Sequence, residues 1–231
     1  MIPALCKYRA SDPYWSSVTS LLHFDGTNGS TSFTDQVSNK VWSASGASIS
    51  TSKSKFGGAS GYFNGSSYIN TASSADWYFG VGDFTVEGWI YINSNSARAG
   101  IWSNFDTSSG STNDGGFALE LTPTNQLNYV HQGIAFVFNS GAATVPTGGW
   151  HHVAASRTSG TAYLFIDGVL AASQADSTNF TSSGTPSLTV GVSLDSTNHY
   201  LNANLDEIRV TNGVGRYTAS FAPPTSAFPN S

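Results

Sequence analysis

Cysteine is almost absent from this chain. Cys6 is the single cysteine, so no disulfide can form within the chain and a cysteine-based zinc site is excluded. The fold must therefore be stabilised by packing and hydrogen bonds. With 231 residues the chain is long enough for one sizeable β domain, because β-sandwiches commonly reach about 200–250 residues as a single unit.

Charged side chains and long apolar runs are also scarce. Charged residues make up 10% of the chain, the net charge is −5, and the nine lysines and arginines are scattered. Without a basic stripe to neutralise phosphates, nucleic acid is not expected as a partner. No run reaches the roughly 18 apolar residues of a membrane span, and the first residues lack the apolar core of a secretory signal. We therefore expect no membrane partner, and synthesis in the cytoplasm without a signal peptide.

Alternating apolar residues and tight turns dominate what is present. Two strand-length runs, 150–157 and 162–166, flank a turn at Ser159-Gly160, and no segment carries a helical apolar stripe over more than two turns. The pattern predicts an all-β protein with two antiparallel sheets packed face to face. The side chains expected in the core between the sheets are Phe84, Val86, Ile90, Ile92, Leu164, Ile166, Ile208 and Val210.

Residues 1–17 differ from the rest because they show no periodicity. They predict an N-terminal arm, followed by a single domain over residues 18–231. The arm carries apolar and aromatic side chains of the kind enriched in protein interfaces, namely Leu5, Tyr8, Tyr14 and Trp15. We expect this arm to anchor the protein to a larger particle, and the alternative is a disordered terminus.

Six motifs in a fixed order carry a family resemblance. They are Leu21-Leu22-His23-Phe24-Asp25-Gly26, residues 55–69 (KFGGASGYFNGSSYI), residues 82–90 (GDFTVEGWI), Trp150-His151-His152-Val153-Ala154, residues 164–169 (LFIDGV) and Leu205-Asp206-Glu207-Ile208-Arg209-Val210. From about Val18 to the C-terminus the chain resembles the laminin-G-like branch of the concanavalin A-like lectin/glucanase superfamily. The resemblance implies a jelly-roll sandwich.

A narrower resemblance rests on the flanking residues. The wording Asp12-Pro13-Tyr14-Trp15 before the first motif, with residues 215–218 (GRYT) and 221–225 (FAPPT) after the last, looks like structural proteins of tailed bacteriophages. It implies a capsid decoration protein or a tail or fibre component, present in several copies on the virion surface and bound to capsid or tail subunits. A phage protein released by lysis needs no signal peptide.

Catalysis is not expected. Glycosidases need paired carboxylates, and the Glu-x-Asp-x-x-Glu pattern of the glucanase relatives is absent around all three glutamates, Glu87, Glu120 and Glu207. Asp206 and Glu207 are adjacent, so on a regular strand they would point to opposite faces. His151 and His152 cannot hold one ion from the same face for the same reason, and we interpret them as packed strand positions.

Ligand binding is expected in two loops, 103–116 and 193–204, because specificity commonly resides in loops on a rigid framework. Their aromatic and amide or acid side chains suit carbohydrate, and the candidates are Asn104, Phe105, Asp106, Asn113, Asp114, Asp195, Asn198, His199 and Tyr200. Glu87 and Trp89 lie on the face opposite Phe84. They would face sugar if that face is the concave one, but we interpret them as framework.

Calcium is the one ion that the resemblance implies. Relatives often hold a structural calcium ion near the start and end of the domain, which here implicates Asp25 and Asp206 with the Gly61 carbonyl. Taken together, the sequence predicts a non-enzymatic virion protein that displays a lectin-like sandwich and binds host-surface glycans. Two alternatives stay open, a purely structural protein without a ligand and a polysaccharide hydrolase.

Overall fold

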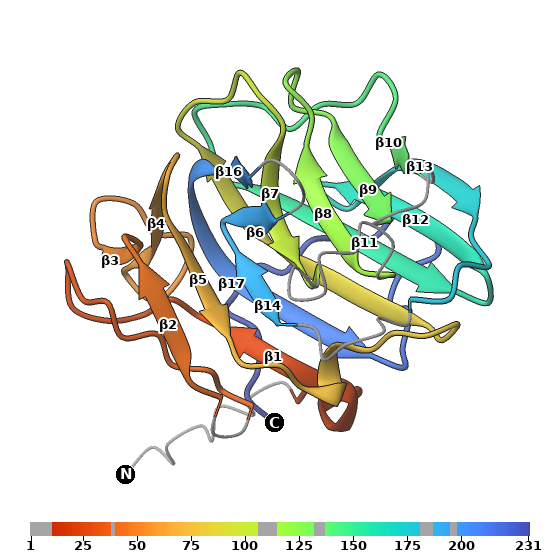
Figure 1. The fold of residues 1–231 in the computed structure, drawn as a ribbon, viewed down its shortest axis with the longest axis horizontal. Helices are drawn as coiled ribbons and strands as arrows, with labels where there is room; N and C mark the ends of the chain where they lie inside the picture. Colours follow the sequence, from red (N-terminus) through yellow and green to blue (C-terminus); the bar gives the residue numbers. More distant parts are fainter. Residues whose placement is uncertain (1–10, 38–39, 106–114, 132–136, 181–186, 195–197) are drawn as a thin grey trace, which may run out of the picture.

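Two antiparallel sheets packed face to face make up a computed structural model of the chain, which describes residues 11–37, 40–105, 115–131, 137–180, 187–194 and 198–231 (Figure 1). The all-β prediction is confirmed. Within these residues the helical elements are two short 3-10 turns, η1 (Trp15–Ser17) and η2 (Ala75–Trp77). No described helix has the length and apolar character to cross a membrane.

The first sheet has eight strands in the order β13-β12-β11-β6-β17-β4-β3, with β1 paired to the end of β17. Its strands are β1 (Val18–Leu22), β3 (Ser48–Ser50), β4 (Ser60–Asn64), β6 (Phe84–Ile92), β11 (His151–Thr158), β12 (Thr161–Ile166), β13 (Val169–Ala175) and β17 (Asn202–Asn212). The two longest strands, β6 and β17, pair along most of their length and form the middle of the sheet.

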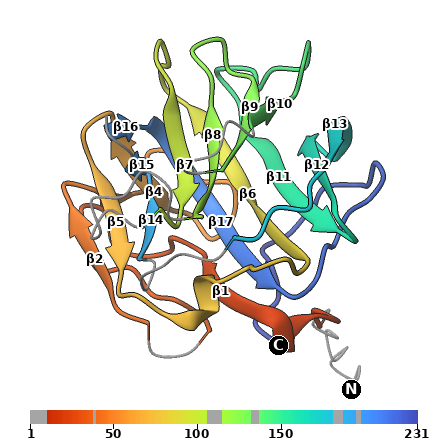
Figure 2. The same cartoon turned by 45° about the vertical axis from the view of Figure 1, so that its right-hand side comes forward.

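The second sheet has seven strands in the order β10-β9-β8-β7-β14-β5-β2. These are β2 (Trp42–Ser45), β5 (Tyr68–Thr71), β7 (Ala99–Ser103), β8 (Phe117–Leu121), β9 (Leu127–His131), β10 (Val137–Asn139) and β14 (Leu188–Val190). A separate hairpin, β15 (Val192–Leu194) and β16 (Asn198–Tyr200), lies between β14 and β17 in the chain. Figure 2 shows this hairpin beside β5 and the seven-stranded sheet.

The turns follow the residue types that mark them. Ser159 and Gly160 both have positive φ, at 48° and 73°, and join β11 to β12 with Thr158 opposite Thr161. Asp167 and Gly168 repeat this pattern between β12 and β13. Two central residues with positive φ match the right-handed twist of the strands, which is why such turns dominate two-residue hairpins. The predicted hairpin is confirmed.

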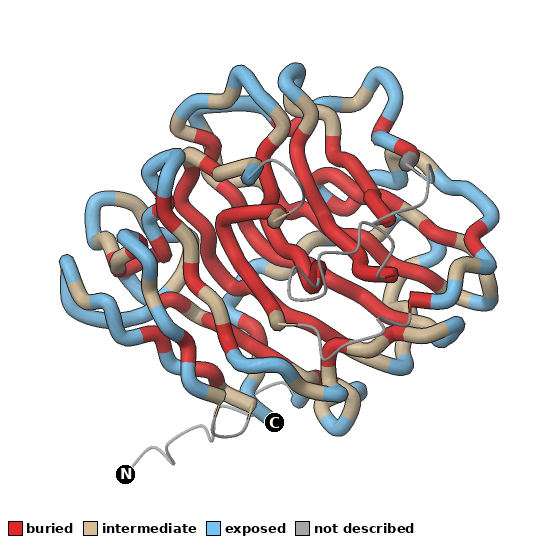
Figure 3. Tube along the Cα trace, in the orientation of Figure 1, coloured by how far each residue is buried: buried red, intermediate tan, exposed pale blue. Residues whose placement is uncertain are grey.

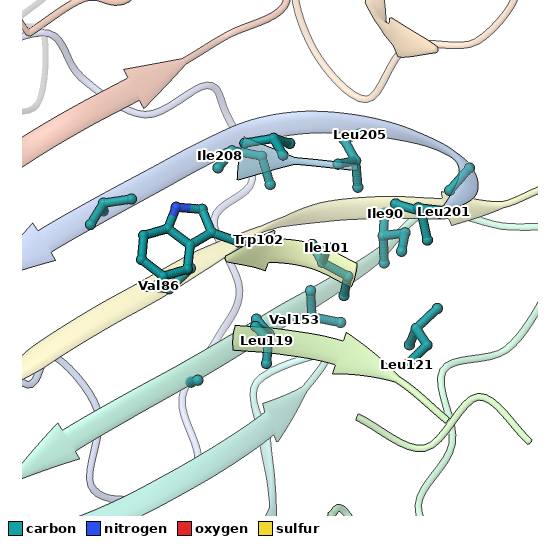
Figure 4. Close-up of a cluster of buried hydrophobic side chains, with 14 of the residues drawn as sticks. Val86, Ile90, Ile101, Trp102, Leu119, Leu121, Val153, Leu201, Leu205 and Ile208 are labelled. Carbon is teal, nitrogen blue, oxygen red and sulfur yellow. The ribbon is translucent and has the colours of Figure 1, made fainter. Parts of the chain in front are cut away.

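The core lies between the sheets and contains all eight predicted core residues. Figure 4 shows Val86 and Ile90 of β6 and Ile208 of β17 facing Trp102 and Leu119 of the opposite sheet. Burial is continuous along the central strands, and exposed residues concentrate in the turns (Figure 3). Alternation within the strands therefore identified the inward face correctly.

A β-bulge in β17 breaks the alternation expected at the last motif. The register with β6 shifts between Asp206 and Arg209, and Glu207 has a φ of +56°. Leu205 and Ile208 both enter the core, while Asp206 lies on the outer face. Gly88 lies opposite this bulge, and a Cβ there would lie 2.4 Å from the Ile208 side chain. Strict alternation would put Asp206 on the same face as Ile208, and the extra residue of the bulge separates them.

The first described residues, 11–17, meet the C-terminal residues on the outer face of the eight-stranded sheet. The amide of Asp12 donates to the carbonyl of Ser231 at 2.7 Å, and Trp15 packs with Val18, Leu21 and Phe228. The expectation of a free arm over residues 1–17 is thus corrected for its second part, because residues 11–17 are packed against the sandwich. Leu5 and Tyr8 lie outside the described residues.

Candidate functional site

The β15–β16 hairpin covers part of the outer face of the seven-stranded sheet, where it contacts β7. Gly100 of β7 allows this approach, because a Cβ at that position would lie 2.2 Å from the backbone nitrogen of Ser193. Residues 193–204 were expected to form one long loop. The structure instead places Ser193, Asn198 and Tyr200 in a paired hairpin, while residues 195–197 lie outside the described residues.

Asn198 and Tyr200 of this hairpin lie beside Tyr68 of β5. The rings of Tyr200 and Tyr68 lie 6.3 Å apart at an angle of 40°, and both side chains are half-buried. The Nδ2 of Asn198, which is exposed, donates to the Tyr200 hydroxyl at 3.1 Å. His199 lies between them and is half-buried. This hairpin surface, defined by Tyr68, Asn198 and Tyr200, offers ring faces and polar groups together.

The structure brings these residues together from two different segments. Tyr68 was not among the expected binding residues, although alternation in β5, with Ile69 in the core, would have placed it outward. Asn198 and Tyr200 were expected, and both lie on the hairpin surface. Sequence could not reveal the pairing, because the contact between β5 and β16 depends on how the hairpin folds back.

The other predicted loop gives a different result. Asn104 is buried, donates to the Trp77 carbonyl at 2.7 Å and accepts from the Phe117 amide at 2.6 Å. Phe105 is buried against Ala118 and Val130. Both are therefore structural residues, and their assignment as ligand contacts is corrected. Asp106, Asn113, Asp114 and Asp195 lie outside the described residues.

One carboxylate lies on the same outer face as the hairpin. Glu120 of β8 is opposite Gly100 of β7 and Asn128 of β9, and its side chain is fully buried by Arg98 and its surroundings. Arg98 makes a two-pronged contact with it, Nη2 to Oε1 being 2.8 Å. An arginine-bound carboxylate with no second acid among its described neighbours cannot provide the acid and the nucleophile that glycoside hydrolysis needs.

Glu87 lies at the centre of an ion network on the outer face of the eight-stranded sheet. Its Oε1 accepts from Arg209 at 2.7 Å, and its Oε2 accepts from the Tyr217 hydroxyl at 2.9 Å. Asp12 bridges Arg209 and Arg216, with contacts of 2.8 Å to each. The interpretation of Glu87 as framework is confirmed, because network and chain termini together bury it.

Electrostatics keep this network charged. Burial by itself would raise the pKa of Glu87, but the Arg209 guanidinium, His152 and Arg216 outweigh it and hold that pKa well below its ordinary value. Burial likewise opposes ionisation of Asp12, yet the hydrogen bond from Arg216 and the nearby Arg209 lower its pKa. Both carboxylates therefore stay ionised at neutral pH and bind their arginines as anions.

The adjacent histidines are structural, as expected. The Nδ1 of His151 lies 2.7 Å from a carboxylate oxygen of Asp167 in the next turn. His152 is fully buried between the rings of Trp89 and Phe221, which lie 5.3 and 5.7 Å from it. His152 is buried, whereas the His151 ring is bound to Asp167, so the two rings do not face one common open surface.

Asp206 and Glu207 lie on the same outer side, which overturns the argument that adjacent positions separate them. Glu207 accepts from the Phe228 amide at 2.8 Å and lies 2.7 Å from His23. Burial would lower the pKa of His23, but Glu207 raises it. Asp206 accepts from the amides of Lys55 and Phe56. Glu207 is thus bound through both oxygens, whereas Asp206 uses only Oδ2 in its two backbone hydrogen bonds.

The calcium that the fold family implies can be tested against Asp206. Its Oδ1 is buried and without a hydrogen-bond partner among the described residues, and burial raises its pKa to about 8. Asp25, which is exposed, lies close enough to raise that pKa further. Gly61 lies opposite Leu205, one residue from Asp206. An unsatisfied carboxylate oxygen beside a second carboxylate fits a hard cation. No cluster of three acidic, histidine or cysteine ligands occurs in the described ranges.

Solved structures share this fold at low sequence identity. Domain 4 of a GH43 extracellular arabinanase from Geobacillus stearothermophilus, in complex with arabinotriose, is 17% identical with a TM-score of 0.63, covering 85% of this chain and 93% of that domain. The binding domain of Paraclostridial Mosquitocidal Protein 1 is 14% identical with a TM-score of 0.66, covering 87% and 50%. These likenesses establish the fold.

A third solved structure is larger than this chain. Trypanosoma rangeli sialidase, in complex with a difluorinated keto-deoxy-nononic acid, is 11% identical with a TM-score of 0.61, covering 93% of this chain and 34% of its own length. No curated protein sequence matches the chain. The family model described as the concanavalin A-like lectin/glucanases superfamily matches residues 63–215, which is more than half of the chain. The chain therefore belongs to the concanavalin A-like lectin/glucanases superfamily.

Proposed function

We propose that this protein is a non-enzymatic glycan-binding module, and that the hairpin surface formed by Tyr68, Asn198 and Tyr200 is where it contacts sugar. One observation carries the proposal. The hairpin, which contacts β7, holds the half-buried Tyr200 ring and the exposed Asn198 amide beside the half-buried Tyr68 ring of β5. Aromatic rings accept the apolar side of a sugar ring, while amide and hydroxyl groups satisfy its hydroxyls.

The surroundings of the three glutamates support binding without hydrolysis. Glu120 is bound by Arg98, Glu87 by Arg209, and Glu207 by His23 and a backbone amide. A general acid needs a free, protonatable carboxyl near the glycosidic oxygen, and a nucleophile needs a second carboxylate about 5–5.5 Å away. The solved relatives include an arabinanase domain bound to arabinotriose and a botulinum neurotoxin described as interacting with two ganglioside molecules. Such partners make a sugar ligand the first choice to test here.

The test is a glycan array on the purified protein, followed by affinity measurement on the best ligand. We expect Tyr200→Ala to weaken binding several-fold or more, because it removes one of the two rings. Tyr14→Ala is the matched control, since it removes another exposed tyrosine, one that lies outside the hairpin surface. Binding that is unchanged in Tyr200→Ala, or absent from every array, would contradict the proposal and leave a purely structural protein. Steady release of reducing ends by pure protein would contradict the non-enzymatic part.

We further propose a place on a bacteriophage virion, as a capsid decoration protein or a tail or fibre component. Support comes from the resemblance of residues 12–15 and 215–225 to tailed-phage structural proteins. Residues 12–15 are packed beside the C-terminal residues, so an anchoring segment before residue 11 would leave the sandwich from one defined place. Electron microscopy of particles with gold-labelled protein tests this location. A protein lacking residues 1–10 should fail to decorate particles, and full decoration by that variant would contradict the anchor.

A structural calcium ion at Asp206 and Asp25 is the last part of the proposal. The ion would neutralise a buried carboxylate and hold the segment at Lys55 and Phe56 over β17. Since a ligand that binds only the folded state stabilises it, calcium should raise the melting temperature and chelation should lower it. Asp206→Asn should melt at the same temperature with and without calcium. A wild-type protein indifferent to calcium would contradict this part alone.

A further inference from the structure

Two lysines differ from the other described cations in having no carboxylate partner. Lys40, Arg98, Arg157, Arg209 and Arg216 each pair with an aspartate or glutamate. Within the described part of the chain, Lys53 and Lys55 make no such pair. Both precede β4 and lie on the outer face of the eight-stranded sheet. In a protein with a net charge of −5, Lys53 and Lys55 are thus two neighbouring ammonium groups outside any described salt bridge.

Lys53 is held in place by a closed set of hydrogen bonds. Its Nζ donates to Asn93 at 2.9 Å, Asn93 donates to Asn204 at 3.1 Å, and Asn204 donates to Ser60 at 3.0 Å. The Ser60 hydroxyl then donates to the carbonyl of Lys53 itself at 2.7 Å. An ammonium group has three donors, so this arrangement leaves donors for a ligand. The side chain is ordered before any ligand arrives, which reduces the entropy cost of binding.

Both ammonium groups lie over aromatic rings. Lys53 Nζ is 4.7 Å from the centre of the Tyr91 ring, and Lys55 Nζ is 3.7 Å from that of Trp89. Trp89 and Tyr91 are two residues apart in β6, so both rings lie on its outer face. The two lysine ammonium groups therefore lie along the same strand. Because an aromatic face attracts a cation without neutralising it, both lysines remain positively charged sites.

Further rings extend this face across the sheet. Tyr62 of β4 and Tyr91 of β6 are both opposite Asn204 of β17, which places their Cα atoms about 10 Å apart, two strand spacings. The Trp150 ring continues the row 5.9 Å from that of Tyr91. Tyr62 is 39% exposed, and Tyr91 and Trp150 are half-buried. The row therefore presents ring surface to solvent next to the two lysines.

We infer that this lysine–aromatic face, formed by Lys53, Lys55, Tyr62, Tyr91 and Trp150, is a second binding surface that takes an acidic polysaccharide. Uronate carboxylates would contact the two ammonium groups, and sugar rings would lie on Tyr62 and Trp150. The argument for this occupant is charge complementarity combined with exposed rings in one row. The face belongs to the eight-stranded sheet, so it is independent of the hairpin surface at Tyr200.

The test uses polygalacturonate and the same polymer with its carboxyl groups methyl-esterified, both titrated against the full chain. We expect the acidic polymer to bind and the esterified one to bind much more weakly. Lys53→Gln and Lys55→Gln should each weaken binding of the acidic polymer about tenfold, the loss of one hydrogen bond to a charged group. Rising salt should weaken binding in the wild type, because exposed charges are screened. Thermal melts of each variant establish that it is folded.

Two control variants and one further test variant make the outcomes decisive. Lys40→Gln removes the same charge from a lysine already paired with Asp76 and should leave the affinity unchanged. Tyr200→Ala should leave it unchanged too, so failure of the hairpin surface would not affect this result. Tyr62→Ala should weaken binding several-fold. Equal binding of both polymers, or affinity that survives loss of both lysines, would overturn the inference. Polyphosphate binding that depends on the lysines but not on Tyr62 would overturn the sugar part.

Discussion

The two ends of the outer face of the eight-stranded sheet differ in what covers them, although one strand, β6, contributes side chains to both. At one end Glu87 is buried under Arg209, Tyr217 and the chain termini. At the other end Tyr91 is half-buried beside Trp150, with the Lys53 ammonium above its ring. Glu87 and Tyr91 lie four residues apart on the same side of one strand.

This difference shows that the alternation of residues along a strand determines which face of the sheet a side chain lies on, but not what covers it there. The sealed end exists because Asp12 and the residues after 215 return to the sheet and bring Arg216 and Tyr217 with them. At the open end residues 53–56 lie over β6, with Lys53 on the Tyr91 ring and Phe56 against the Trp89 ring. The sealed end therefore contributes to the stability of the fold, and the open end offers a surface for binding. Variants at the two ends should separate an effect on unfolding from an effect on binding.

The largest effect should come from Arg209→Ala at the sealed end. The change leaves Glu87 and part of the Asp12 carboxylate buried without their cation. Breaking a buried ion pair by removing one partner costs about 3–5 kcal/mol. Urea or guanidinium unfolding followed by fluorescence measures this change in the free energy of unfolding. A loss below about 1 kcal/mol would mean that the network relaxes and does not lock the termini.

Asp12→Ala should have a smaller but clear effect. It removes the carboxylate that accepts hydrogen bonds from Arg209 and Arg216, which costs about 1–3 kcal/mol for unsatisfied buried donors. Deleting residues 1–10 leaves every described contact intact and should change stability by no more than about 0.5 kcal/mol. Equal losses in the two proteins would show that residues 11–17 do not belong to the packed unit.

Acid should affect the sealed end specifically. The pKa of Glu87 is depressed in the folded state relative to its ordinary value near 4.5. The folded state therefore binds fewer protons than the unfolded state below that pH, so the stability from Glu87 is present above about pH 4.5 and is lost as the pH falls. Melting temperatures between pH 5 and 3 should fall less steeply in Glu87→Gln than in the wild type. Parallel curves would contradict this role of Glu87.

The smallest effect on stability should come from Tyr62→Ala at the open end. Tyr62 is exposed and lies outside the core, so its loss should change the free energy of unfolding by about 0.5 kcal/mol or less. The same variant is expected to weaken binding of an acidic polysaccharide. A large loss of stability without any change in binding would make the open end another part of the framework.

A second comparison shows how far residue types predict a site. Asn104 with Phe105, and Asn198 with Tyr200, have the same chemistry and were expected to play the same part. The first pair is buried in hydrogen bonds to Trp77 and Phe117 and in a small apolar cluster, while the second pair lies on the hairpin surface. Loops of similar composition cannot be told apart before the strands that flank them are placed.

Sequence was sufficient where the signal is local. Alternation of apolar residues predicted the inward faces of β6 and β12, and Ser159-Gly160 predicted a hairpin, because a strand has a fixed period of two and a tight turn needs positive φ. Family motifs predicted the jelly-roll sandwich. These features depend only on residues that are close together in the chain.

Tertiary structure decided everything that joins distant segments. The bulge at Glu207 inverts β17 and places Asp206 on the outer face, and the termini bury Glu87. The 53–56 segment brings two lysines to the rings of β6. Each of these depends on contacts between residues more than thirty positions apart, for which the period of a strand carries no information. Sequence therefore determined the two sheets and their core, and only packing between distant segments determined which polar groups are framework and which are surface.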